Sequence, residues 1–197
     1  MRRRQQLPML STEKLEIAHA LQAGRTALGE ALAGVDPPLA RRKPARGGWS
    51  ILECVEHVAV SEWHLLAQVR HATPIAQPLE NPLRESRILE RGVDRSRPVV
   101  CPEPGLPANR FATVQDALAD FDAVRAQTLR NVEEFSGDPR SFLTEHPVIP
   151  GPVNLVEMWL TMAVHPARHA LQIHEIRDTL ASRAKSSLER PAARTVR

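Results

Sequence analysis

Apolar residues recur at intervals of three and four along four long segments of the chain, a spacing typical of amphipathic helices. The segments cover residues 11–34, 50–71, 113–136 and 154–180. No segment of useful length alternates between apolar and polar residues, so the sequence predicts no β-strand. Four helices of about 20 residues or more are typical of a bundle. The pattern therefore predicts an all-α protein with a four-helix bundle.

Three of the four predicted helices carry a start signal in the sequence. A short polar residue stands three positions before an acidic one at Ser50/Glu53, Thr113/Asp116 and Asn154/Glu157. At this spacing, each side chain can bind the backbone amide of the other residue, which stabilises the first turn. These pairs place the starts of the second, third and fourth helices.

The second and third helices are separated by a long proline-rich insertion, residues 73–109. A short helix is predicted in its middle, around "LRESRILERG", and the rest is expected to be loop. Loops of this length tend to be either functional or disordered. If functional, the insertion is a cover over one end of the bundle or an interface. Residues 35–48 contain three prolines and two glycines and cannot continue the first helix.

Composition indicates one folded domain. The chain has 197 residues, 42% apolar and 25% charged, which suffices for one sizeable core. We expect an N-terminal tail over residues 1–10, the helical bundle over residues 11–181 and a disordered tail over residues 182–197.

Several classes of protein are disfavoured. No apolar run reaches the length of about 18 residues that a membrane helix needs, and no secretion signal is visible. Cys54 and Cys101 lie in unlike surroundings, which argues against a disulfide. The net charge is only +3, and basic residues are interspersed with acidic ones, unlike a nucleic-acid-binding face. We therefore expect a cytoplasmic protein with no nucleic-acid or membrane partner.

Candidate chemistry lies on the last predicted helix. Steps of three and four residues trace one stripe, which is apolar at both ends and polar in its middle: Leu155, Met158, Met162, His165, His169, Gln172 and Ile176. Burying such polar groups without partners costs about 1–3 kcal/mol each. His165 and His169, four residues apart, lie one above the other on a helix and can reach one metal ion.

A metal site needs at least one ligand from another helix. His57, His64 and His71 share a face of the second helix, but each step spans about 10 Å, so at most one of them can join. His57 is the candidate, because it lies two turns inside the capped helix. The other histidines are expected at the surface or its boundary: His19, His64, His71, His146 and His174.

Pro166 directly follows the first histidine of the pair. Within a helix, proline removes one backbone hydrogen bond and crowds the carbonyl of Met162, so we expect a kink or local opening there. The proline either aims His165 toward the ion or disturbs its geometry.

Two stretches of the chain resemble the DinB-like (YfiT-like) family of four-helix-bundle metalloenzymes. "GGWSILECVEHVAVSE" is similar to the family's tryptophan-led second helix, which here contains His57 and Glu62. "EHPVIPGPVNLVEMWLTMAVHPARHALQI" is similar to its histidine-proline loop and final H-x-x-R-H-x-x-Q helix. The resemblance implies that His57, His165 and His169 bind a divalent metal, with water or substrate in the open positions.

The resemblance implies zinc or nickel as the ion, with iron or manganese as further options. It assigns Arg168 and Gln172 to supporting positions around the ligands. Among characterised members are enzymes that use low-molecular-weight thiols such as bacillithiol or mycothiol. It therefore implies a metal-dependent hydrolase or thiol transferase with a small-molecule substrate, and possible assembly as a homodimer.

Three residues are candidates for proton transfer near the ion: Glu53, Glu62 and His64. Cys54 is either a soft fourth ligand or reactive thiol, or a small core residue. Two alternatives to an enzyme stay open. The same histidines could hold a structural metal in a stress-response or interaction module, or they could be satisfied by hydrogen bonds without any metal.

Overall fold

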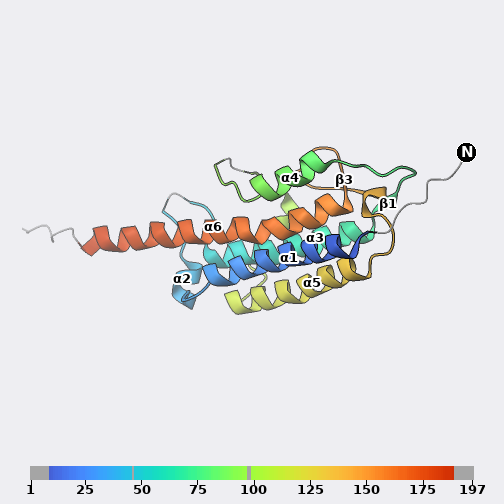
Figure 1. Cartoon of the computed structure of the whole chain (residues 1–197). Helices are drawn as coiled ribbons and strands as arrows, with labels where there is room; N and C mark the ends of the chain where they lie inside the picture. The colour runs from blue at the N-terminus through green and yellow to red at the C-terminus, as the bar shows by residue number, and fades with distance from the viewer. Residues whose placement is uncertain (1–8, 46, 97–98, 189–197) are drawn as a thin grey trace, which may run out of the picture.

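The computed structural model describes residues 9–45, 47–96 and 99–188. Its four long helices are α1 (Ser11–Ala31), α3 (Ile51–Arg70), α5 (Val114–Glu134) and α6 (Leu155–Leu188), which lie side by side (Figure 1). Helix α1 packs mainly on α6, and α3 packs on both α5 and α6. The predicted four-helix bundle is therefore confirmed. Every helix of the described residues is too short or too polar to cross a membrane.

The predicted start signals form as hydrogen-bonded caps. The Ser50 side chain accepts the Glu53 amide, and the Glu53 carboxylate accepts the Ser50 amide. Thr113 with Asp116 and Asn154 with Glu157 make the same reciprocal pairs. These bonds satisfy amides that a helix start otherwise leaves unpaired, which explains why α3, α5 and α6 begin where they do.

The end of the last helix differs from the sequence-based prediction. Helix α6 continues to Leu188, beyond the predicted end near Leu180, because nothing after Leu180 breaks a helix before Pro191. Residues 189–197 of the expected C-terminal tail and residues 1–8 of the expected N-terminal tail lie outside the described residues.

A small antiparallel sheet caps one end of the bundle, and the prediction that the chain has no strand is wrong. Its strands are β1 (Thr73–Pro74), β2 (Phe142–Glu145) and β3 (Pro152–Asn154), in the order β1-β2-β3. The register pairs Thr73 with Leu143 and Leu143 with Asn154. Strands of two to four residues are too short to show an alternating pattern, which is why the sequence did not reveal them.

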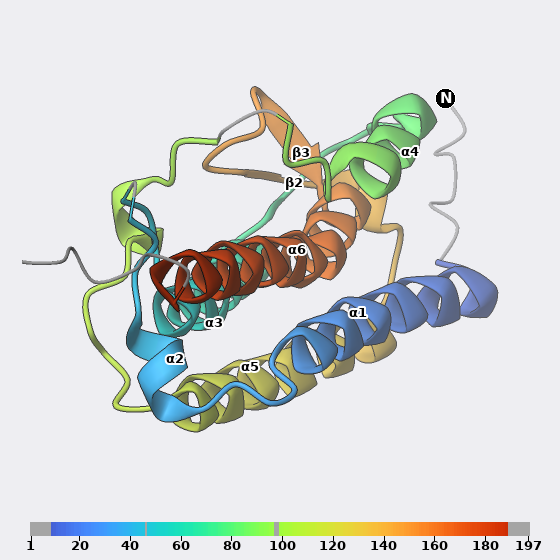
Figure 2. The ribbon, with the colours of Figure 1, turned by 90° about the vertical axis from the view of Figure 1, so that its left-hand side faces the viewer.

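The proline-rich insertion is only partly a loop. It contains strand β1, the predicted short helix as α4 (Pro82–Arg91), and a 3₁₀ turn, η1 (Glu103–Gly105). Helix α4 packs on α6, and η1 packs on α3 (Figure 2). The insertion therefore lies along the two helices that carry the predicted metal ligands.

Two further short elements complete the fold. A five-residue helix, α2 (Pro37–Arg41), forms between α1 and α3, with prolines at its first two positions and the Asp36 side chain accepting the Leu39 amide. Proline is well tolerated there because those amides have no partner within the helix. The 3₁₀ turn η2 (Pro139–Ser141) precedes β2.

The core consists of two apolar clusters with a polar layer between them. Along α6, the first cluster extends to Ala163 and the second begins at Ala170. His165 and His169 lie in the interval. On α3, the interval between the clusters contains Glu62, which is 1% exposed. The middle of the bundle is therefore the place where buried polar chemistry concentrates.

Candidate metal centre

Three histidines from two helices converge in this layer. The Nε2 atom of His165 lies 3.0 Å from Nε2 of His57 and 3.1 Å from Nε2 of His169. One nitrogen from each ring lies within 4.8 Å of the other two. The structure thus brings together the three histidines that the sequence singled out, although His57 precedes the other two by more than a hundred residues.

The outward-facing nitrogens of two rings are fixed by oxygen acceptors. The Nδ1 of His57 donates to the Gly105 carbonyl at 2.7 Å, and the Nδ1 of His169 donates to Gln172 Oε1 at 2.9 Å. Because these oxygens can only accept, both Nδ1 atoms carry the hydrogen. In the neutral rings, the lone pair is then on Nε2, which faces the centre of the cluster.

This arrangement calls for a positive charge at the centre. The lone pairs of His57 and His169 both point toward His165, whose Nε2 has at most one hydrogen to donate. At least one close pair of nitrogens is therefore left without a shared hydrogen, which is unfavourable in a buried site. A divalent cation among the three nitrogens would satisfy all of them, and neutral imidazole is a common ligand of such ions. The cluster fits a divalent metal.

Burial keeps the three rings neutral and ready to bind a cation. His57 and His169 are each only 7% exposed, and His165 is partly buried. Desolvation lowers the pKa of His57. It lowers the pKa of His165 and His169 well below the usual value, and the neighbouring histidines lower both further. Metal binding needs neutral imidazoles, so these shifts favour it near neutral pH.

Trp49 and Cys101 border the cluster from outside. The Trp49 ring centroid lies 4.8 Å from that of His57 and 6.2 Å from that of His169, and it is nearly parallel to the latter. Cys101 Sγ lies 3.6 Å from Nδ1 of His57, on the side away from the three Nε2 atoms. Trp49 thus packs beside two of the three histidines, His57 and His169.

Pro166 does not break the last helix, which continues through it to Leu188. The carbonyl of Met162, which a residue with an N–H at position 166 would normally bind, accepts instead from Arg125 Nη2 at 2.8 Å. An arginine from α5 therefore replaces the bond that the proline removes. The Met162 carbonyl keeps a hydrogen-bond partner, and the His165 ring reaches the other two histidines.

Two glycines hold the same turn of α6 closely. A Cβ at Gly24 of α1 would overlap the carbonyl oxygen of Ala163, and one at Gly92 would overlap the Val164 side chain. Neither glycine has a positive φ, so the requirement is for close contact. The segment just before His165 is therefore fixed from both sides.

The three candidates for proton transfer are placed elsewhere. Glu53 belongs to the cap of α3 and pairs with Lys43 at 2.7 Å. Glu62 pairs with Arg125, and His64 packs against the Trp63 ring. Each has a structural partner instead of a place in the cluster.

The other residues considered near the site lie in the core, at the surface or in contact with a histidine of the cluster. Cys54 is fully buried in the apolar core, and burial raises its pKa to about 12, as expected for a core thiol. Both cysteines are free. His174 is exposed, as its helical angle predicts. Gln172 supports His169, whereas Arg168 donates to the carbonyl of Asp94 in the insertion.

His146 is partly buried, and it lies close enough to His165 for its charge to lower the pKa of that ring. Its Nδ1 accepts the amides of Val148 and Ile149, so Nε2 carries the hydrogen in the neutral ring. Burial lowers its pKa to about 4.

The sequence did not reveal the contribution of the insertion. Gly105 supplies the acceptor for His57, and Arg95 donates to Gln172 Oε1 at 3.4 Å. Both residues stand in a segment without hydrophobic periodicity, so no pattern relates them to a histidine far away in the sequence. The only signal was the unusual length of the insertion.

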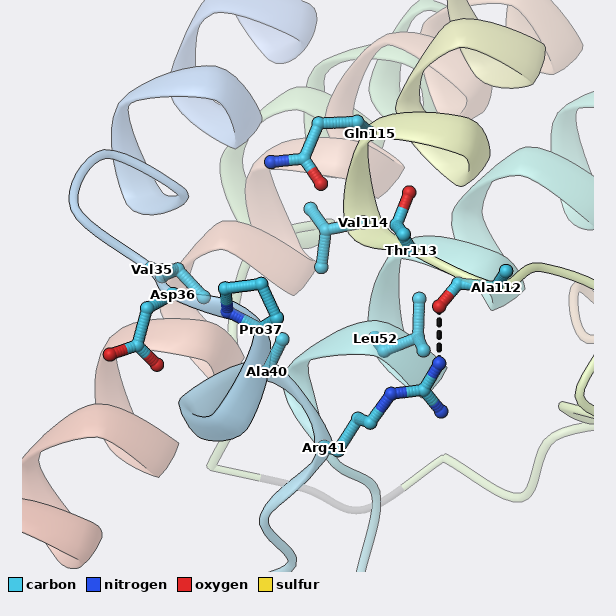
Figure 3. Close-up of a pocket in the computed structure, with 10 residues that line it drawn as sticks. All are labelled: Val35, Asp36, Pro37, Ala40, Arg41, Leu52, Ala112, Thr113, Val114 and Gln115. Carbon is cyan, nitrogen blue, oxygen red and sulfur yellow. Dashed lines mark hydrogen bonds between the residues drawn. The ribbon is translucent and has the colours of Figure 1, made fainter.

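The two cavities described for the chain do not include the cluster. One, of about 20 Å³, lies where α2 meets the start of α5 and has room for about one water molecule. Figure 3 shows two of its lining residues, Arg41 and Ala112, joined by a hydrogen bond from the Arg41 guanidinium to the Ala112 carbonyl. The other is an open depression bordered by Pro44, Asp178 and Arg183. Neither is lined by a predicted ligand.

A helical bundle with a buried three-histidine centre is the class of protein that fold and site define. The chain belongs to the DinB superfamily, which it matches over residues 20–173. The family resemblance of the sequence is thus confirmed.

Solved structures show the same fold. The chain is similar to TT2238, described as a four-helix bundle protein, with 24% identity and a TM-score of 0.54 over 82% of this chain and 98% of that one. It is also similar to YfiT from Bacillus subtilis, described as a probable metal-dependent hydrolase with an unusual four-helix bundle topology. That match has 14% identity and a TM-score of 0.56 over 88% of this chain and 90% of YfiT. A comparison with curated proteins found no match.

Proposed function

We propose that the chain is a metal-dependent hydrolase in which His57, His165 and His169 bind one divalent ion. The observation that carries the proposal is the convergence of three Nε2 atoms, two of which, on His57 and His169, direct their lone pairs toward the third. The description of YfiT as a probable metal-dependent hydrolase agrees with it. Three protein ligands leave at least one position for water or substrate, as in catalytic zinc sites.

A metal ion held by these histidines would activate water as a nucleophile and polarise a substrate carbonyl or phosphoryl oxygen. The protein contributes orientation and exclusion of water. Gly105 and Gln172 fix the rings of His57 and His169, and Trp49 covers both rings.

The finer assignments extend this proposal. Zinc or nickel is the expected ion, while iron and manganese also suit three imidazoles. The substrate is a small molecule. A transferase that activates a low-molecular-weight thiol is the variant reaction, because the same ion would hold a thiolate in the open position. Homodimer formation stays a prediction.

A structural metal site is the second candidate. It is favoured by the burial of His57 and His169, each only 7% exposed, which limits access to the centre. In a structural site, the ion would have four fixed ligands and no exchangeable position.

Substitution of His169 tests the proposal. His169→Ala should lower the zinc or nickel content of the purified protein from about one per chain to near zero, because two imidazoles hold the ion poorly. His174→Ala, a histidine exposed on the same helix, is the matched control and should keep the metal. Each protein is then screened with ester, amide and phosphoester substrates and for thiol conjugation.

A turnover that disappears with His169→Ala and persists with His174→Ala supports the enzyme. Cobalt-substituted protein distinguishes the structural alternative, since azide should change the visible spectrum only if a coordination position is open. Full metal content with a spectrum insensitive to azide would favour the structural site.

A further inference from the structure

The orientation of His57 depends on a segment of the insertion. Its Nδ1 has the Gly105 carbonyl at 2.7 Å, whereas Ser61 Oγ lies at 3.4 Å and Cys101 Sγ at 3.6 Å. The carbonyl is the shortest contact and can only accept a hydrogen. It therefore selects the tautomer of His57 whose lone pair faces the other two histidines.

Gly105 can approach the ring because it has no side chain. It ends the turn η1, where its amide donates to the Pro102 carbonyl. A Cβ at this position would lie 3.2 Å from Cε1 and Nδ1 of His57 and 3.2 Å from Cys101 Sγ. These contacts are tighter than ordinary packing, so an added methyl group would move the turn or the ring.

A buried carboxylate holds the segment that follows the turn. Glu56 is 1% exposed, and its Oε1 accepts the amide of Ala108 at 2.7 Å, the amide of Arg110 at 3.3 Å and Arg110 Nη1 at 3.1 Å. Asn109, between the two amides, has a φ of 59°. This left-handed conformation, which asparagine tolerates well, lets neighbouring amides point to one acceptor.

Glu56 immediately precedes His57 on α3, so the tether and the ligand share one rigid element. The Arg110 guanidinium also donates to the Leu106 carbonyl at 3.0 Å, which joins the tethered residues to the turn. The carboxylate is buried, and every hydrogen bond described for it comes from residues 108–110. A buried carboxylate needs such partners, so Glu56 and the segment depend on each other.

We propose that Glu56 is a positioning residue for the metal centre, which acts by holding residues 105–110 so that the Gly105 carbonyl orients His57. This proposal rests on the proposed metal-binding function. It gives the insertion a role: its last part orients a ligand of the site. Partners of this kind around a metal ligand typically change metal affinity by 10–100-fold.

The test compares Glu56→Ala, Glu56→Gln and Asp122→Asn. Asp122 forms the ion pair between α1 and α5 with Arg25, which makes it a control for the loss of one tertiary ion pair away from the segment. The first readout is the tautomer of His57 in metal-free protein, from the ring ¹⁵N shifts of histidine-labelled samples. The second is zinc affinity, from competition with a chromophoric chelator.

We expect wild type to show the Nδ1–H tautomer of His57. Glu56→Ala should give a mixture of tautomers and at least a tenfold loss of zinc affinity. Glu56→Gln, which keeps one acceptor oxygen, should recover part of both, and Asp122→Asn should change neither. A single tautomer and an affinity within about twofold of wild type in Glu56→Ala would overturn the proposal, even if the variant melts at a lower temperature.

A second variant covers the case in which Glu56→Ala does not fold. Gly105→Ala changes a turn next to exposed residues and should produce the same two effects. If wild type itself binds no zinc, the proposed function fails. The tautomer measurement then decides alone whether the segment orients His57.

Discussion

Two polar clusters occupy the same layer of the bundle, and they differ in how completely the protein satisfies them. In one, Arg125 Nη2 donates to Glu62 Oε2 at 2.9 Å and Arg125 Nη1 to the Leu21 carbonyl at 2.6 Å, while Thr128 donates to Glu62 Oε1 at 2.8 Å. Arg125 Nε lies 2.8 Å from Glu62 Oε1, in an ion pair outside hydrogen-bonding geometry. Opposite charges are matched, and each nitrogen of the guanidinium has an oxygen within 2.9 Å.

The histidine cluster has the opposite character. The inward nitrogens of His57 and His169 are acceptors, that of His165 has at most one hydrogen to donate, and no carboxylate from the described residues stands among them. The outer nitrogens of His57 and His169 have partners, which fix the inner ones. The Arg125 cluster is therefore a completed internal network that also supports the turn before His165, whereas the histidine cluster needs an external cation. The comparison indicates that the histidine cluster, and not the Arg125 cluster, is the candidate metal site.

Removing Glu62 should produce the largest loss of stability. Glu62→Ala leaves the 2% exposed Arg125 guanidinium without its counter-charge, so we expect the free energy of unfolding to fall by about 3–5 kcal/mol. Urea denaturation of the metal-free protein measures this. A loss below about 1 kcal/mol would mean that the stability of the fold does not depend on the ion pair inside the Arg125 cluster.

Acidification should destabilise the metal-free protein through the histidines. Burial lowers the folded-state pKa of His57, His165 and His169 below the usual 6.5, and that of His146 to about 4. Below pH 6.5, the unfolded chain binds protons that the folded chain does not. The histidine contribution to stability is therefore fully present above pH 6.5 and is lost as the pH falls.

Each such histidine should contribute a slope of at most about 1.4 kcal/mol per pH unit. Urea unfolding at pH 7.5, 6.5 and 5.5 is the measurement, with His165→Met compared with wild type. The variant should show the shallower slope; equal slopes would contradict the assigned burial of His165.

Replacing one histidine of the cluster should change the free energy of unfolding in the opposite direction from replacing Glu62. In metal-free protein, His165→Met removes one of the facing nitrogens and fills the space with an apolar side chain. The free energy of unfolding should stay unchanged or rise by about 1–2 kcal/mol, as for other replacements of buried polar groups. Thermal unfolding after treatment with a chelator reports this. A loss above 2 kcal/mol would show that the cluster is held by its own hydrogen bonds, without need for a metal.

Loss of a helix cap should affect neither cluster directly. Ser50→Ala removes the acceptor for the Glu53 amide and should cost about 1 kcal/mol of stability. Metal content should be unchanged, because His57 lies two turns further along α3. A parallel loss of metal would show that the centre depends on the start of the helix more than its geometry indicates.

The helices and the three histidines could be predicted because their signals are local. Caps such as Ser50 with Glu53 and the spacing of His165 and His169 are read within one helical turn. The place of His57 inside a capped helix and the family resemblance predict it as the third histidine, and it lies in the cluster.

The parts that could not be predicted depend on contacts between distant segments. Gly105 and His57 are 48 residues apart, and Arg125 and Met162 are 37 residues apart. The sequence predicts that Pro166 removes a hydrogen bond from the Met162 carbonyl, but only the fold shows that Arg125 donates to this carbonyl instead. The small sheet escaped prediction for a similar reason, because strands of two to four residues are defined by their pairing.

The most direct test of a three-histidine metal centre is metal analysis of purified protein with and without His57. Wild type and His57→Ala are expressed side by side, exchanged into metal-free buffer and measured by mass spectrometry for divalent metals, with circular dichroism as the check on folding. The account predicts about one zinc or nickel ion per wild-type chain and almost none in the folded variant. Equal metal content in the two proteins, or a wild type that stays metal-free after reconstitution, would contradict it.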